Sequence, residues 1–227
     1  MKKINRRQFI RDFSLVGAGA VLSQVPGFIK SRFETGIEIS PAEDLMREHG
    51  VLNRIMLIYE ESLRRIKNNQ EVDLNTINKA AKIIRTFIED YHEKLEEDFI
   101  FPLFRQDSTL YNLVNILQKQ HNVGRDLTTK IIELSKAPVS SDYSLLIAAI
   151  ENFVYMYRPH EAWEDTVLFP AIHKKLSPKK YAELGEMFEE KEHDLFGKEG
   201  FEKVVQDVSE LEQILDIHQL DKFTAKT

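Results

Sequence analysis

The sequence has no cysteine, few glycines and prolines (nine and seven among 227 residues) and a shortage of positive charge. The absence of cysteine excludes disulfides, cysteine-ligated zinc or iron–sulfur sites and thiol catalysis. Residues 31–227 contain 25 basic and 36 acidic side chains, a formal charge of -11, so we expect no nucleic-acid binding. The same residues hold only six glycines and six prolines, and their apolar residues recur at helical spacing rather than alternating.

The first thirty residues have a different composition, with six basic side chains and one acid. The segment R-R-Q-F-I at residues 6–10 resembles a twin-arginine export signal, and the charge-free residues 13–29 that follow are shorter than the roughly 20 residues of a spanning helix. We interpret residues 1–30 as an export signal peptide and expect a periplasmic protein that contacts a membrane only through this leader, if it stays uncleaved. The alternative is a basic tail with an apolar anchor.

Four apolar stripes with three- and four-residue steps follow the leader, at residues 45–63, 81–99, 110–131 and 146–167. Each predicts a helix of roughly 25 residues. Ser40 and Asp142 are candidate caps for the first and fourth helices, and Pro102, Pro138 and Pro170 are expected to end the second, third and fourth.

These helices, with short connections, predict an all-α protein built on an up-down-up-down four-helix bundle over residues 40–171. Residues 178–217 are expected to form a C-terminal extension of one or two further helices. The sequence does not indicate the role of this extension.

The bundle contains an internal repeat. Residues 92–102, H-E-K-L-E-E-D-F-I-F-P, match residues 160–170, H-E-A-W-E-D-T-V-L-F-P, at five of eleven positions. Upstream, R-E-H-G-V around His49 corresponds to K-Q-H-N-V around His121. The bundle is therefore predicted to be a duplicated helical hairpin, each half contributing one histidine and then one His-x-x-x-Glu motif.

The repeated residues form a candidate metal site. All four histidines lie in apolar stripes and so project into the core, and each glutamate lies one turn after a histidine on the same helical face. Buried carboxylates without a cation cost several kcal/mol per charge. Four imidazoles and two carboxylates are too many ligands for one tetrahedral zinc and suit two ions bridged by carboxylates. The proposed metal ligands are His49, His92, Glu96, His121, His160 and Glu164.

The ordered pattern of these six residues, with a Phe-Pro pair after each His-x-x-x-Glu motif, resembles the hemerythrin-like domain in its bacterial His-His-Glu form, over about residues 40–171. The resemblance implies a non-haem centre of two iron ions that binds dioxygen, nitric oxide or peroxide, with those six side chains as ligands.

This chain departs from the oxygen-carrying members of that family. Those members have a second histidine in the third helix, where this chain has Arg125. Glu93 and Glu161, each directly after a ligand histidine, are either additional ligands or acids that lie beside the site or at the surface. His193 either supplies a missing nitrogen or belongs to a solvated helix face. The more oxygen-rich ligand set stabilises ferric iron and disfavours reversible oxygen carriage.

Three functions remain open from the sequence. The first is a di-iron protein that binds or senses dioxygen or related small oxidants. The second is an enzyme on the same scaffold that degrades hydrogen peroxide or nitric oxide, and the third is a helical interaction module without metal. Zinc or manganese are alternatives to iron, and the sequence does not indicate the oligomeric state.

Overall fold

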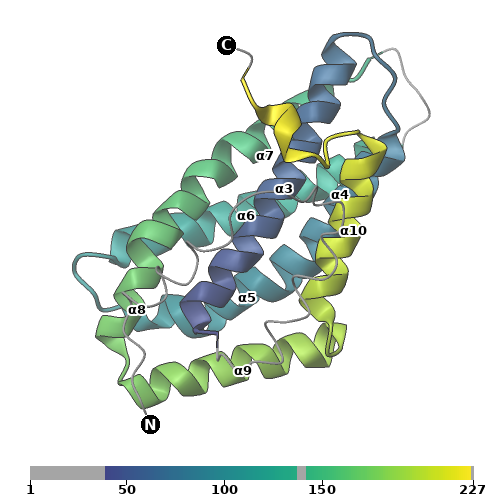
Figure 1. Ribbon diagram of the computed structural model, residues 1–227. Helices are drawn as coiled ribbons and strands as arrows, with labels where there is room; N and C mark the ends of the chain where they lie inside the picture. The colour runs from purple at the N-terminus through teal and green to yellow at the C-terminus, as the bar shows by residue number, and fades with distance from the viewer. Residues whose placement is uncertain (1–38, 137–141, 226–227) are drawn as a thin grey trace. The chain divides into compact units, whose positions relative to one another are not determined.

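The computed structural model describes residues 39–136 and 142–225, and these residues form helices joined by short connections (Figure 1). The described residues contain no strand. The all-α prediction is confirmed. The leader proposed at residues 1–30, and Pro138 with its expected role in ending a helix, lie outside the described residues.

The first helix, α3 (Pro41–Lys67), begins as its sequence predicts. The Ser40 hydroxyl accepts a hydrogen bond from the Glu43 amide at 3.2 Å, and Pro41 takes the first helical position, where its missing N–H costs nothing. Acidic residues in the first turn and basic residues in the last turn stabilise the helix through their interaction with its dipole.

The second bundle helix is continuous in direction but changes its hydrogen-bonding pattern along its length. Its segments are α4 (Leu74–Ile83), the π-helical η1 (Ile84–His92), α5 (Glu93–Leu95), the π-helical η2 (Glu96–Ile100) and the 3₁₀ turn η3 (Phe101–Phe104). The wide π turns surround the first His-x-x-x-Glu motif, and such turns occur frequently at functional sites.

The second hairpin contains α6 (Tyr111–Leu134), α7 (Ser144–Trp163), the π-helical η4 (Glu164–Leu168) and α8 (Phe169–Lys175). The Asp142 carboxylate accepts a hydrogen bond from the Ser144 amide at 2.8 Å, which supports the start of α7. A π turn begins at the glutamate of the motif in both hairpins, at Glu96 and at Glu164.

The prediction that Pro170 ends the fourth helix is wrong. The helix continues for two turns as α8, with Pro170 in its first turn. Pro102 likewise lies inside the 3₁₀ turn η3 and stops the helix only two residues later. Each proline follows a π segment, whose wider turn accommodates the proline ring that would clash with the preceding turn of a regular α-helix.

Helix contacts close a four-membered ring: α3 packs on α4 and η1, these pack on α6, α6 packs on α7, and α7 packs on α3. The core between them is apolar and aromatic, with Ile55, Phe87 and Phe153 fully buried. Burial of each such side chain contributes about 1.5–3 kcal/mol. Buried polar side chains interrupt this core, among them those of the repeated motifs.

The C-terminal extension forms α9 (Pro178–Phe196) and α10 (Gly200–Ile214). α9 contacts α3, α8 and α10, and α10 contacts α3 and α4 (Figure 1). Gly197, with φ of 82°, ends α9 in a conformation that other residues rarely adopt. Across residues 39–136 and 142–225, every helix is too short or too polar to span a bilayer.

Candidate metal centre

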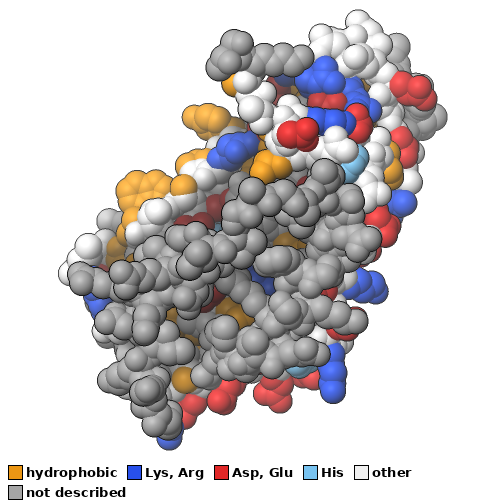
Figure 2. All heavy atoms as spheres, in the orientation of Figure 1, with side chains coloured by type: hydrophobic (Ala, Val, Ile, Leu, Met, Phe, Trp, Pro, Cys, Tyr) orange, Lys and Arg blue, Asp and Glu red, His pale blue; other side chains and the backbone are white. Residues whose placement is uncertain are grey.

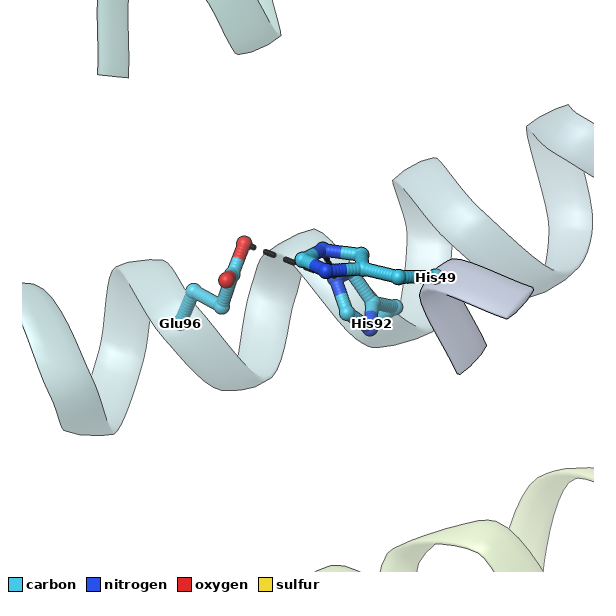
Figure 3. A group of neighbouring side chains, drawn as sticks. All are labelled: His49, His92 and Glu96. Atoms are coloured by element: carbon cyan, nitrogen blue, oxygen red, sulfur yellow. Dashed lines mark hydrogen bonds and ion pairs between the residues drawn. The ribbon is translucent and has the colours of Figure 1, made fainter. Parts of the chain in front are cut away.

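The structure brings together the six side chains of the duplicated motif in the middle of the bundle. Each has at most 3% of its surface exposed: His49, His92, Glu96, His121, His160 and Glu164. They form two groups of two histidines and one glutamate, and Figure 3 shows the group from α3 and the second helix. The two Nε2 atoms lie 3.1 Å apart in this group and 3.2 Å apart in the other.

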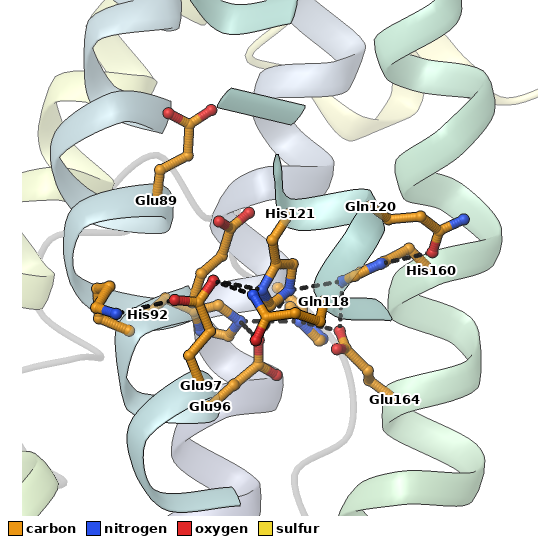
Figure 4. Close-up of polar contacts among 12 residues, drawn as sticks. Glu89, His92, Glu96, Glu97, Gln118, Gln120, His121, His160 and Glu164 are labelled. Carbon is orange, nitrogen blue, oxygen red and sulfur yellow. Dashed lines mark hydrogen bonds and ion pairs between the residues drawn. The ribbon is translucent and has the colours of Figure 1, made fainter. Parts of the chain in front are cut away.

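Glu96 lies between the two groups of histidines (Figure 4). Its Oε2 is 3.7 Å from Nε2 of His92 in its own hairpin and 3.4 Å from Nε2 of His121 in the other hairpin. A carboxylate in this position can contribute to two ions at once.

Glu164 repeats this arrangement with the hairpins exchanged. Its Oε2 is 3.0 Å from Nε2 of His160 and 3.4 Å from Nε2 of His49. Both oxygens of Glu96 and of Glu164 are buried without a hydrogen-bond partner. Buried carboxylates are normally paired or bound to a metal, so these four orphaned oxygens fit a cation site.

The Nδ1 atom of each of the four histidines contacts a side-chain oxygen of a neighbouring residue. The Nδ1 contacts are His49 with Asp165 at 2.7 Å, His92 with Glu48 at 2.6 Å, His121 with Glu97 at 3.2 Å and His160 with Gln120 at 2.9 Å. These oxygens fix the ring orientation and favour a proton on Nδ1, which leaves the Nε2 lone pair for a metal ion.

These four acceptors were not predicted from the sequence, although the repeat contains a signal for them. Glu48 and Gln120 each precede the first histidine of a hairpin, and each orients the other histidine of the same hairpin. Glu97 and Asp165 each follow the motif glutamate, and each orients a histidine of the opposite hairpin. The repeat therefore includes the residue before the first histidine of each hairpin and the residue after each motif glutamate.

Glu93 lies beside the centre, fully buried, and contacts other protein groups. It accepts a hydrogen bond from the Tyr157 hydroxyl at 2.7 Å and pairs with Arg125 at 2.8 Å. The same Arg125 amino group pairs with Glu97 at 2.7 Å. Gly124 makes room for this network, because a Cβ there would overlap the Tyr157 hydroxyl.

Glu161 is the counterpart of Glu93 in the second hairpin. It accepts a hydrogen bond from the Asn53 side chain and is almost completely buried. Asn53 and Arg125 both lie four residues after the first histidine of their hairpin, so the two hairpins hold equivalent acids with different partners.

His193 is not brought to the other ligands. It lies on the exposed face of α9, 4.0 Å from Glu189 on the same helix. His193 therefore belongs to a solvated helix face, the second of its two interpretations from the sequence.

Burial and contacts between the side chains together control the protonation of the site, and the contacts of His49 with Asp165 and Glu164 raise its pKa. Burial lowers the pKa of His92 well below its ordinary value and that of His121 to about 4, so both rings are neutral at pH 7, the form that binds metal. Burial and the charge of Glu164 raise the pKa of Glu96. Without a cation, the two carboxylates therefore compete for ionisation.

A largely apolar cavity of about 350 Å³ lies against the centre between α6 and α7, with His160, Gln120, Pro159 and Trp163 in its wall. Figure 2 shows hydrophobic side chains at the edge where Figure 1 places α7. Trp163, which lies within the fourth apolar stripe, is 55% exposed at this cavity.

Comparisons with known proteins agree with this geometry. The family described as the hemerythrin HHE cation binding domain matches residues 40–142 and again residues 112–225. Uncharacterized proteins of Mycobacterium bovis and Mycobacterium tuberculosis are similar to this chain, 40% identical over 194 residues that cover 84% of this chain and 76% of theirs. No solved structure matches the chain. The chain belongs to the hemerythrin HHE cation-binding domain family.

Proposed function

We propose that the protein holds two iron ions bridged by Glu96 and Glu164, and that this centre binds or senses dioxygen or a related small oxidant. The position of the two carboxylates carries the proposal. Each glutamate lies between a histidine of its own hairpin and one of the other, so the two groups of ligands share their acids.

The ligand set favours iron over zinc. Structural zinc sites are closed tetrahedra, whereas helix bundles with several inward carboxylates and histidines are suited to pairs of iron or manganese ions. Two histidines and a share of two carboxylates leave coordination positions open on each ion. Bound ferrous iron supplies at these positions the electrons that a small oxidant accepts.

The surroundings of the site support a small, uncharged ligand. The centre is buried, and the cavity beside His160 and Trp163 is lined mainly by apolar side chains. Dioxygen and nitric oxide are small and apolar, so they can enter such a site, whereas charged substrates are disfavoured by desolvation.

The first test is the metal content and visible spectrum of protein purified from iron-replete cells. We expect about two irons per chain and an oxo-bridge absorption that changes on exposure to air or peroxide. One zinc per chain with no response to oxidants contradicts the proposal.

The second candidate is an enzyme that degrades peroxide or nitric oxide, and the environment of Arg125 favours it. Arg125 takes the place of the additional histidine expected in an oxygen carrier and pairs with Glu93 and Glu97. A centre with fewer nitrogen ligands stabilises ferric iron. Sustained oxygen release from hydrogen peroxide in an oxygen electrode identifies the enzyme, whereas a spectral change without turnover identifies the binder or sensor.

We also propose that the protein is exported, on the basis of the twin-arginine pattern at residues 6–10. This route carries folded proteins, so the metal centre can be assembled before export. Fractionation of cells expressing the full chain and a variant with both arginines replaced by lysine tests this. Equal periplasmic amounts of the two proteins contradict the proposal.

A further inference from the structure

A second cluster of carboxylates lies between α3 and α9, outside the His–Glu centre. Asp44 and Glu48 are one turn apart on α3, and Glu192 extends from α9. One oxygen of each lies within 4.8 Å of the other two. α9 follows the duplicated hairpins, so the C-terminal extension supplies one of the three acids.

Two buried polar groups at this cluster have no hydrogen-bond partner. Glu48 is fully buried, and while its Oε2 holds His92, its Oε1 is unpartnered. The Tyr91 hydroxyl is also buried and unpartnered. Buried polar atoms of this kind are normally satisfied by a bound ion or an ordered water.

Among the described residues, the three acids of the cluster contact one arginine and one imidazole. Arg47 lies 3.4 Å from Asp44 and stacks over the Phe201 ring at 4.2 Å, and the His92 ring contacts Glu48 at 2.6 Å. Burial and mutual repulsion raise the pKa of Asp44 and of Glu192, each to about 7. One divalent cation would offset the excess negative charge.

We propose that Asp44, Glu48 and Glu192 form a second metal site, which takes a hard divalent cation of the class of Ca²⁺ and Mn²⁺. All three ligands are carboxylates, the donors that such ions prefer, whereas the His–Glu centre offers imidazole. Asp44 and Glu192 are only partly buried, so water can complete the coordination. The bound ion links α9 to the bundle and, through Glu48, contacts the residue that orients His92.

Terbium(III) luminescence tests this site, because terbium prefers oxygen ligands and a nearby tyrosine, here Tyr91, sensitises its emission. The full-length, iron-loaded protein is titrated with Tb³⁺ under excitation of tyrosine. We expect saturable emission that Ca²⁺ displaces, and a loss of Tb³⁺ affinity of about tenfold or more in Glu192→Gln, because affinity follows the number of charged ligands. Glu190→Gln, an exposed neighbour on α9, is the matched control and should leave the affinity unchanged.

Two results overturn the proposal. One is an unchanged Tb³⁺ affinity in both Glu192→Gln and Asp44→Asn, with circular dichroism showing that the variants are folded. The other is emission that disappears in Glu96→Gln but persists in Glu192→Gln, which places the probe in the His–Glu centre. Iron content is measured on the same samples, so that a failure of the second-site proposal can be distinguished from a failure of the iron proposal.

Discussion

At the scale of single residues, the two hairpins share a plan but differ in the groups that surround their histidines. Each imidazole is held by an acceptor that lies next to a ligand in the sequence. The removal of such an acceptor typically lowers metal affinity or activity by about 10–100-fold. The six proposed ligands could be predicted because they repeat, whereas their neighbours differ between the halves, as Glu48 and Gln120 do, so the repeat marks the positions of these neighbours but not their role.

Glu96→Gln tests the bridge. The amide keeps the size of the side chain but removes the charge that two ions would share, so iron is expected to fall from about two per chain to about one or fewer. Elemental analysis of the purified variant measures this. Asp98→Asn, an exposed acid on the same helix, is the control and should keep its iron. Full iron occupancy in Glu96→Gln would mean that Glu96 is not a bridging ligand.

Gly124→Ala tests the close approach of Tyr157 to α6. The added Cβ overlaps the Tyr157 hydroxyl, so the free energy of unfolding should fall by about 1–3 kcal/mol. Gly50→Ala is the matched control, since nothing lies within 4 Å of its Cβ, and it should stabilise the helix by about 0.5–1 kcal/mol. Urea unfolding measures both. Equal effects would show that Tyr157 moves away without cost.

At the scale of helices, periodicity predicted where the elements lie but not their local geometry. The apolar stripes located all four bundle helices, because the 3.6-residue repeat decides which side chains are buried. The π segments η1, η2 and η4 have no signal in this periodicity. For that reason, Pro170 was wrongly expected to end its helix.

The packing of α9 on α3 creates a pH-dependent contribution to stability at Asp44. Burial raises its folded pKa from 3.8 to about 7, so between these values the folded chain keeps a proton that the unfolded chain has lost. This contribution to stability is therefore lost as pH rises toward 7. Asp44→Asn does not titrate, and its stability relative to the parent should increase from pH 5 to pH 8. Urea midpoints in the presence of a chelator measure the difference, and a constant difference would contradict it.

At the scale of the whole molecule, the helical bundle and the convergence of the six repeated side chains were predictable from the sequence, whereas the position of the C-terminal extension was not. The contact between Glu192 on α9 and the acids of α3 joins residues more than 140 positions apart, and no repeat in the sequence marks it. Long-range contacts of this kind depend on how complete helices pack rather than on a local pattern.

Removal of metal is expected to destabilise the entire bundle, because Glu96 and Glu164 then remain buried without a cation. At an ion concentration 100 times its dissociation constant, binding contributes about 2.7 kcal/mol to the folded state, which corresponds to about 5–10 °C in Tm for a chain of this size. Calorimetry before and after chelation measures the shift. Identical melting temperatures would show that the ions do not support the fold.

The unequal acceptors of the four histidines also bear on electron transfer. The His49 and His92 rings both face carboxylates, Asp165 and Glu48. On the other side, the acid that holds His121 is paired with Arg125, and His160 faces an amide. Anionic acceptors make an imidazole more electron-donating and so stabilise the oxidised ion. With the two proposed iron ions bound, the duplicated centre is consequently polarised, and a half-oxidised, mixed-valence state is expected to localise its ferric charge on the side of His49 and His92.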